Sequence, residues 1–242
     1  HAQNFSAYTK ELFIKGNDTL PYRLLLPENY DPSKKYPLII FLHGSGERGN
    51  DNESQLSHGA DLFLRNDIRK NYPAIVVFPQ CPASSFWSNV DIKTDNIGKE
   101  KFDFSPAGKP TVAMVLTEGM IKQLEHKYAV NKKQVYVGGL SMGGMGTFEI
   151  ARRNPKLFAA AFPMCGGANP SSANKMKGTA WWIFHGAKDD VVDPSFSQQM
   201  ADALREVKAD IKFTLYPNAN HNCWDNAFAE PELLPWLFSH HK

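Results

Sequence analysis

This sequence has a small net charge, few cysteines and no long hydrophobic run. Its 27 Lys and Arg residues nearly balance 25 Asp and Glu residues, which leaves a formal charge of +2. That balance gives no electrostatic reason to expect nucleic acid or an anionic membrane as a partner. The longest apolar runs, such as Pro37–Leu42 and Ala180–Phe184, are far shorter than the roughly 20 residues of a transmembrane helix. We therefore expect a soluble protein that binds neither nucleic acid nor membrane.

The three cysteines, Cys81, Cys165 and Cys223, are widely spaced and odd in number. They form no CxxC motif and no Cys/His pairing of the zinc type, so no metal site is predicted. One disulfide with one free thiol, or three buried thiols, both remain open at this stage.

Length and composition indicate one domain over residues 1–242. The chain has 42% hydrophobic and 21% charged residues, close to the average of a globular protein. A chain of this length buries enough apolar surface to fold without a disulfide or a metal. It shows no internal repeat and no low-complexity run that would divide it.

Eight short runs rich in apolar and β-branched residues predict strands. They are Glu11–Lys15, Leu20–Leu26, Tyr36–Leu42, Ala74–Phe78, Val135–Gly138, Phe158–Met164, Ala180–Phe184 and Ile211–Tyr216. The turn residues Gly16-Asn17-Asp18 between the first two runs predict an antiparallel hairpin.

Helical patterns alternate with the later strands. Three of them cover Val112 to Tyr128, Ser141 to Arg153 and Pro231 to His241. A further one begins with Asp193 as N-cap and Pro194 as first helical residue. A hairpin followed by strand–helix alternation predicts an α/β protein with an eight-stranded, mostly parallel sheet flanked by helices. The functional residues are then expected at the carboxyl ends of the strands.

The segment Gly139-Leu140-Ser141-Met142-Gly143 follows the fifth predicted strand and opens a predicted helix. This G-x-S-x-G pattern is typical of a nucleophile elbow, in which a tight strand-to-helix turn strains the serine backbone and excludes neighbouring side chains. The alternative is a glycine-rich turn with an incidental serine. Because the pattern lies between a strand and a helix, as the elbow requires, we predict that Ser141 is a nucleophile.

A nucleophilic serine needs a histidine as base, and the histidine needs a carboxylate that fixes its tautomer. In elbow-type folds the acid follows the serine along the chain and the histidine comes last. His221 fits this order, because it comes shortly after the last predicted strand. His185 precedes the nearby acids, and His240 and His241 lie at the chain end. His221 is therefore the predicted base.

The acid is expected in the loop after the seventh predicted strand. Of the aspartates in this loop, Asp193 is assigned to the N-cap of the next helix. Position and chemistry permit either Asp189 or Asp190, and spacing does not decide between them.

Two backbone N–H groups should face the oxygen that becomes negative during acyl transfer. One is expected from Met142, the residue after the serine. The other is expected from Ser45, with Gly44 as the alternative, in the glycine-containing loop after the third strand. His43 precedes the serine and so fails the order expected of a base; we expect it to brace this loop.

Four segments give the chain a resemblance to a known group of proteins: FLHGSGERGND at 41–51, GLSMGG at 139–144, HGAKDD at 185–190 and NHNCW at 220–224. Over nearly its whole length it resembles the α/β-hydrolases, in the peptidase and esterase branch near dienelactone hydrolases, polyhydroxybutyrate depolymerases and bacterial feruloyl and acetylxylan esterases. The resemblance implies the α/β-hydrolase fold with no metal and no cofactor. It also implies that the acid is Asp189, the fifth residue of the H-G-x-x-D stretch.

Aromatic residues mark the candidate substrate contacts. The segment Pro79–Pro110 has no clear periodicity, so we expect a long irregular loop near the site. Its Phe86 and Trp87 are expected to stack on a sugar or a phenolic acid, unless the loop buries its own aromatic rings. Trp224, close after His221, is expected to wall the same pocket or to anchor the histidine loop.

The expected activity is hydrolysis of a carboxylic ester through an acyl-enzyme, on a small-molecule or polysaccharide-linked ester. The resemblance favours feruloyl or acetyl groups on plant cell-wall polysaccharide. The alternatives are a serine peptidase of the prolyl-oligopeptidase-like kind and a non-catalytic binding protein on a hydrolase scaffold. The chain begins at His1, as a mature terminus does after signal cleavage, so we expect a secreted or periplasmic protein, with a cytoplasmic one as the alternative.

Overall fold

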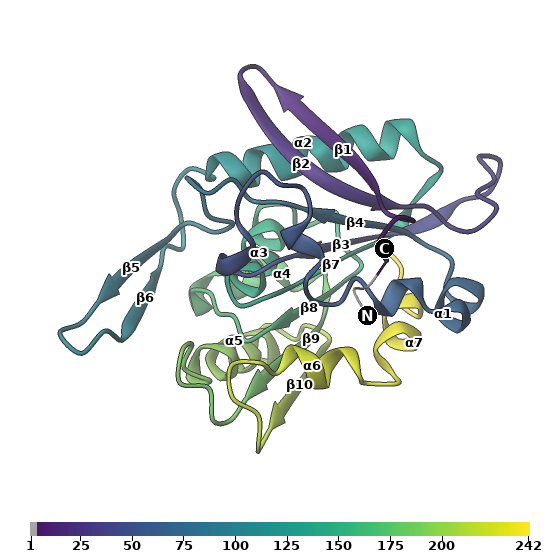
Figure 1. Ribbon diagram of the computed structural model, residues 1–242. Coiled ribbons are helices and arrows are strands. Elements are labelled where there is room, and N and C mark those ends of the chain that lie inside the picture. Colours follow the sequence, from purple (N-terminus) through teal and green to yellow (C-terminus); the bar gives the residue numbers. More distant parts are fainter. Residues whose placement is uncertain (1–3) are drawn as a thin grey trace.

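A twisted sheet of eight strands crosses the middle of the molecule, with helices on both faces (Figure 1). The computed structural model describes residues 4–242, and the sheet within this range has the order β1-β2-β4-β3-β7-β8-β9-β10. β2 pairs antiparallel with β1 and β4, and the other pairs are parallel. The predicted fold class is therefore confirmed. The strands are β1 (Thr9–Lys15), β2 (Asp18–Leu25), β3 (Tyr36–Leu42), β4 (Ile75–Pro79), β7 (Val130–Leu140), β8 (Ala160–Met164), β9 (Ala180–Gly186) and β10 (Ile211–Tyr216).

The helices form one layer on each side of this sheet. One layer consists of α2 (Val112–Lys127), α3 (Met142–Arg153) and α5 (Ser195–Glu206). The other consists of α1 (Asn66–Asn71), α6 (Trp224–Phe228) and α7 (Leu233–Phe238). Shorter helical turns are α4 (Ala173–Met176), η1 (Ser45–Glu47), η2 (Ser54–Leu56), η3 (Leu62–Leu64) and η4 (Pro170–Ser172).

The central strands are buried on both faces, which explains their continuous apolar sequences. In β3, Leu38, Ile40 and Leu42 belong to the core beneath α2 and α3. The alternate residues Ile39 and Phe41 belong to the core beneath α6 and α7. Because β3, β7, β9 and β10 are parallel, their carboxyl ends meet at the same edge of the sheet, and the loops that follow them can build one site.

The segment after β4 differs from the irregular loop that we expected. It contains a hairpin of β5 (Val90–Thr94) and β6 (Glu100–Phe104), which projects from the left of the molecule in Figure 1. A two-stranded ribbon outside the main sheet buries few residues, so its sequence carries little hydrophobic periodicity. At its base, Phe102 and Phe104 stack with centroids 6.2 Å apart, and Phe104 packs on Phe196 of α5 at 5.3 Å.

Several element ends also differ from the sequence expectation. β7 begins at Val130, earlier than predicted, and the prediction missed this part of the strand because residues 131–134 are polar and show no apolar run. The segment Pro231–His241 contains only the short helix α7, and α6 precedes it. α5 begins one residue later than expected, at Ser195 with Pro194 as N-cap, and the Ser195 N–H donates to Asp193 Oδ1 at 2.9 Å.

The structure decides whether the three cysteines form a disulfide. Cys81, Cys165 and Cys223 all lie within the described residues, and each is buried and free. The reading as three buried thiols is confirmed, and the fold is held together by its core and hydrogen bonds rather than by a disulfide among these residues.

Candidate active site

Ser141 lies at the tight turn between β7 and α3. Its backbone has φ 53° and ψ −116°, outside the regions that side-chain-bearing residues normally occupy. An added Cβ at Gly139 would collide with the carbonyl of Gly143, and one at Gly143 would collide with that of Leu42. Glycine is therefore required on both sides of the serine, and the turn has the geometry of the predicted nucleophile elbow.

His221, in the loop between β10 and α6, connects the serine to a carboxylate. Its Nε2 lies 2.9 Å from Ser141 Oγ, and its Nδ1 lies 2.8 Å from Asp189 Oδ2. Asp190 is exposed and reaches the histidine loop only through its backbone N–H, which donates to Asn220 Oδ1 at 3.1 Å. The structure thus brings Ser141, His221 and Asp189 together, and it leaves Asp190 outside.

Asp189 is held by more partners than the sequence indicated. Its Oδ1 accepts the N–H groups of Val191 and Val192, both at 2.9 Å, and its Oδ2 lies 3.1 Å from Nε2 of the buried His185. Burial by itself raises the pKa of the Asp189 carboxyl. Hydrogen bonds from His185 and His221 outweigh burial and hold that pKa well below its usual range, so the carboxylate is ionised at neutral pH.

His185 is the residue of this site that sequence reasoning missed. It lies within β9, the strand that Asp189 follows, and its side chain is completely buried. Nε2 faces two acceptors, Asp189 Oδ2 and the carbonyl of Val192 at 2.9 Å, so it carries the proton. Nδ1 lies 2.6 Å from Ser197 Oγ. His185 therefore orients Asp189. The only local sequence signal for this role is that His185 is the histidine of the H-G-x-x-D stretch.

The two expected oxyanion donors, Ser45 and Met142, each lie at the start of a helical segment. Ser45 is the first residue of η1 and Met142 the first residue of α3. N–H groups in the first turn of a helix have no partner within that helix, so both remain able to donate to a bound oxygen. An added Cβ at Gly44 would lie 2.9 Å from Leu140 Cδ1, so glycine allows this loop to approach the end of β7 closely.

His43 braces this loop, as the sequence led us to expect. Its Nε2 accepts the N–H of Cys81 at 2.9 Å, which leaves the proton on Nδ1, 2.6 Å from the carbonyl of Gly44. Burial lowers the pKa of His43 to about 4, so the ring is neutral at neutral pH.

The prediction that Trp87 contacts substrate is wrong. Its side chain is 0% exposed, and its Nε1–H donates to the carbonyl of His43 at 3.0 Å. The ring also packs against Gly146 of α3, where an added Cβ would be 2.5 Å from Trp87 Cβ. A fully buried ring offers no face to a ligand, and the indole N–H needs a buried acceptor, which the loop carbonyl provides.

The other two expected contacts remain partly accessible. Phe86 is half-buried, with the Arg48 guanidinium 5.8 Å from its ring centroid. Trp224 is half-buried and packs edge-to-face on His221, with ring centroids 5.5 Å apart. Trp224 also packs on His58, with ring centroids 5.1 Å apart. Trp224 is thus the expected contact that directly borders the base.

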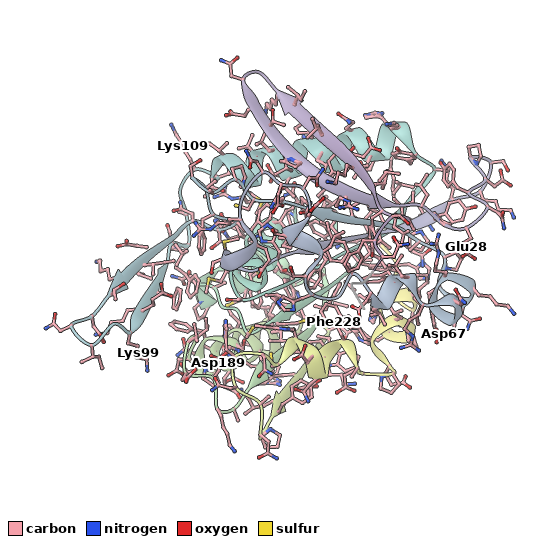
Figure 2. All side chains as sticks on the ribbon, viewed as in Figure 1. Glu28, Asp67, Lys99, Lys109, Asp189 and Phe228 are labelled. Carbon is pink, nitrogen blue, oxygen red and sulfur yellow. The ribbon has the colours of Figure 1, made fainter. Side chains whose placement is uncertain are left out.

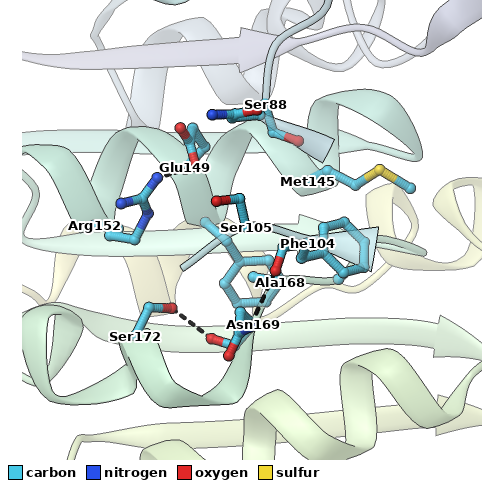
Figure 3. Close-up of a pocket in the computed structure, with 12 residues that line it drawn as sticks. Ser88, Phe104, Ser105, Met145, Glu149, Arg152, Ala168, Asn169 and Ser172 are labelled. Atoms are coloured by element: carbon cyan, nitrogen blue, oxygen red, sulfur yellow. Dashed lines mark hydrogen bonds and ion pairs between the residues drawn. The ribbon is translucent and has the colours of Figure 1, made fainter. Parts of the chain in front are cut away.

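A cavity near the β5–β6 hairpin is too small to receive a substrate. Figure 3 shows it between α3 and the loop of Asn169, whose Nδ2–H donates to the carbonyl of Phe104 at 3.0 Å. Its volume of about 10 Å³ fits about one water molecule. Ser88 Oγ has no hydrogen-bond partner among residues 4–242, so such a water would satisfy it.

One side-chain cluster in the site has metal-ligating groups. The ligand atoms of Cys165, Asp189 and His221 all lie within 4.8 Å of one another. Both nitrogens of His221 are already engaged, and burial raises the pKa of the Cys165 thiol well above its usual range. A metal needs a thiolate and a free imidazole nitrogen, so this arrangement does not fit one.

The strand order, the strained serine after β7 and the histidine and carboxylate that follow it define an α/β-hydrolase. The family described as "Putative esterase" matches residues 16–212. The chain belongs to this esterase family and is a carboxylic-ester hydrolase. No helix within residues 4–242 combines the length and the apolar character needed to span a membrane.

Curated relatives are similar to most of the chain. Lysophospholipase-like protein 1 of Mus musculus is 27% identical over 210 residues, which are 83% of this chain and 85% of the relative. "Probable feruloyl esterase C" of Aspergillus oryzae is 25% identical over 171 residues, 71% of this chain and 55% of the relative. The bifunctional acetylxylan esterase/xylanase XynS20E of Neocallimastix patriciarum is 33% identical over 201 residues, 79% of this chain and 25% of the relative. The chain therefore spans about half or less of these two fungal relatives.

Among solved structures, that of a thermostable esterase is similar with a TM-score of 0.86 and 31% identity. The match covers 98% of this chain and 64% of the other. The similarity therefore extends over the whole sheet and the loops at its carboxyl edge.

Proposed function

We propose that Ser141, His221 and Asp189 act as nucleophile, base and orienting acid in ester hydrolysis through an acyl-enzyme. Ser141 Oγ attacks the ester carbonyl carbon while its proton passes to His221 Nε2. Asp189 accepts the Nδ1–H of His221, which fixes the tautomer and stabilises the imidazolium. The observation that carries this proposal is the pair of hydrogen bonds on His221, at 2.9 Å to the serine and 2.8 Å to the aspartate.

The oxygen of the attacked carbonyl becomes negative and accepts the N–H groups of Ser45 and Met142. The tetrahedral intermediate then collapses, the bond to the alcohol oxygen breaks, and His221 Nε2 gives its proton to the departing alcohol. In the second half of the reaction His221 deprotonates a water, which attacks the acyl carbon. Release of the acid returns the proton to Ser141 Oγ, so the enzyme is regenerated.

A Ser141→Ala variant tests this mechanism. It should fold normally and lose turnover of nitrophenyl acetate by on the order of 10⁶-fold, the loss measured for other triad serines. A fluorophosphonate probe should label the wild type and not the variant. Ser171→Ala, at an exposed serine on η4, is the matched control and should keep both properties. Labelling that persists in Ser141→Ala would assign the nucleophile to another residue.

For the substrate, we propose acetyl or feruloyl groups on plant cell-wall polysaccharide. The proposal is supported by the names of the two fungal relatives, an acetylxylan esterase/xylanase and a feruloyl esterase. Phe86 and Trp224 are the proposed aromatic contacts, since both keep part of their rings accessible. Acetylated xylan and methyl ferulate should be hydrolysed faster than peptide amides under the same conditions. Faster cleavage of the amides would favour a peptidase instead.

We also propose that the protein acts outside the cytoplasm, because a cell-wall polysaccharide is too large to enter a cell. The first residues, on which the expectation of secretion was based, lie outside the described range. Fractionation of expressing cells tests the proposal: recovery of the esterase activity solely in the cytoplasm would contradict it.

A further inference from the structure

Two hollows lie next to each other between residues 57–72 and residues 224–235. The first has a volume of about 340 Å³, and its lining includes His58, Arg65, Trp224 and Phe228. The second, of about 350 Å³, shares Arg65 and Phe228 with the first and continues to Tyr72. Because they share lining residues, the two hollows adjoin each other, and we call the pair the α6 groove. Figure 2 labels Phe228, which lines both hollows, and Asp67, which lines the outer one.

The α6 groove adjoins the proposed catalytic base through one lining residue. Trp224 lines the first hollow, and its ring packs on His221 with centroids 5.5 Å apart. In the proposed mechanism His221 Nε2 delivers its proton to the oxygen of the leaving alcohol. That oxygen must therefore lie beside His221, and the contact of Trp224 with His221 brings the groove next to the same position.

The floor of the groove depends on one glycine. Gly59 has φ +82°, and an added Cβ would collide with the ring of Phe228. On its other side Phe228 packs on Phe41 of β3, with ring centroids 5.1 Å apart. The ring is thus clamped between the loop before η3 and the central sheet, so the groove has a rigid aromatic floor.

The lining combines aromatic faces with hydrogen-bonding groups. Trp224 and Tyr72 are half-buried, and each leaves part of its ring accessible. Arg65 is exposed and held by Asp67, with Nη2 and Oδ2 2.6 Å apart. Aromatic rings bury the apolar faces of sugars, while charged side chains hydrogen-bond their hydroxyl groups. The remaining charged residues of the lining are mostly acidic, namely Asp61, Asp225 and Glu230. An acidic lining disfavours anionic chains.

We infer that the α6 groove binds the neutral sugar residues of the alcohol part of a polysaccharide ester. This inference rests on the proposed function, since it assigns a subsite for the leaving group of that reaction. It places Arg65 and Trp224 as residues that determine specificity for glycan-linked esters over esters of small alcohols.

The first test measures binding without turnover. Ser141→Ala protein is titrated with neutral xylo-oligosaccharides in a calorimeter, alone and combined with Arg65→Ala. The second substitution should weaken binding by about tenfold, through loss of a charged hydrogen-bond donor. Arg205→Ala is the matched control: Arg205 is likewise exposed and paired with an aspartate, Asp202, at 2.7 Å, but lies on α5. It should leave the binding constant as it is.

The second test compares substrates. The ratio of kcat/KM for a feruloylated xylo-oligosaccharide to that for methyl ferulate should fall by about tenfold in Arg65→Ala and not in Arg205→Ala. Equal behaviour of the two arginine variants overturns the inference, as does preferential binding of basic peptides over xylo-oligosaccharides. An enzyme that hydrolyses methyl ferulate but binds no oligosaccharide also overturns the inference while leaving ester hydrolysis in place. Failure to hydrolyse any ester, by contrast, would contradict the proposed function itself.

Discussion

Replacement of Trp87 separates a structural role from contact with substrate. The side chain is fully buried, and truncation of a buried Trp to Ala costs about 3–5 kcal/mol of unfolding free energy. For a protein of this size each kcal/mol shifts the melting temperature by about 2–4 °C, so Trp87→Ala should melt roughly 6–20 °C below the wild type. Trp87→Phe keeps most of the ring but leaves the His43 carbonyl unpaired, at a cost of about 1–3 kcal/mol.

The kinetic consequence follows from the loop that Trp87 supports. The indole donates to the carbonyl of His43, next to Gly44 and to the proposed oxyanion donor Ser45. Each variant should therefore lower kcat/KM by one common factor on every ester. That factor should stay at or below about 10²–10³, the effect of losing one oxyanion donor altogether. The assay compares nitrophenyl acetate with methyl ferulate, beside a melting curve. A loss confined to methyl ferulate with an unchanged melting temperature would refute the reasoning.

Three further predictions concern other buried groups. Asp189→Asn should lower kcat by about 10⁴-fold with little change in fold, whereas Asp190→Asn, at an exposed residue, should retain most activity; the reverse order would mean that the acid is misassigned. In the folded protein the pKa of His43 is lowered to about 4, below its value in the unfolded chain. Between about pH 6.5 and pH 4 the unfolded chain therefore binds more protons at this residue than the folded protein does. His43 thus lowers the free energy of unfolding as the pH falls through that window. Denaturant unfolding should show wild type losing on the order of 3 kcal/mol relative to His43→Gln between pH 7 and pH 4, and parallel curves would contradict this. Finally, the three buried thiols should react with a thiol reagent only after unfolding, and a reducing agent should leave the melting temperature unchanged; a decrease on reduction would reveal a disulfide.

The sequence by itself determined the parts of this protein that depend on short-range patterns. The apolar runs of β3 and β10 predicted strands with the observed ends, because burial on both faces or packing against a helix leaves a local signature. Gly139 and Gly143 predicted the elbow, because steric exclusion around Ser141 acts between neighbours in the chain. Chain order, together with its place shortly after the last predicted strand, then singled out His221.

Tertiary structure decided what depends on contacts between distant segments. Asp189 and Asp190 are adjacent and chemically equal, and only the fold places one against His221 and His185 and leaves the other in solvent. Trp87 occurs in a polar stretch, but its burial comes from Gly146 and the loop of His43, which are remote in sequence. The α6 groove likewise exists only where residues 57–72 meet α6. Local sequence encodes the preferences of a segment, whereas the surroundings of a side chain are set by whichever distant segments pack on it.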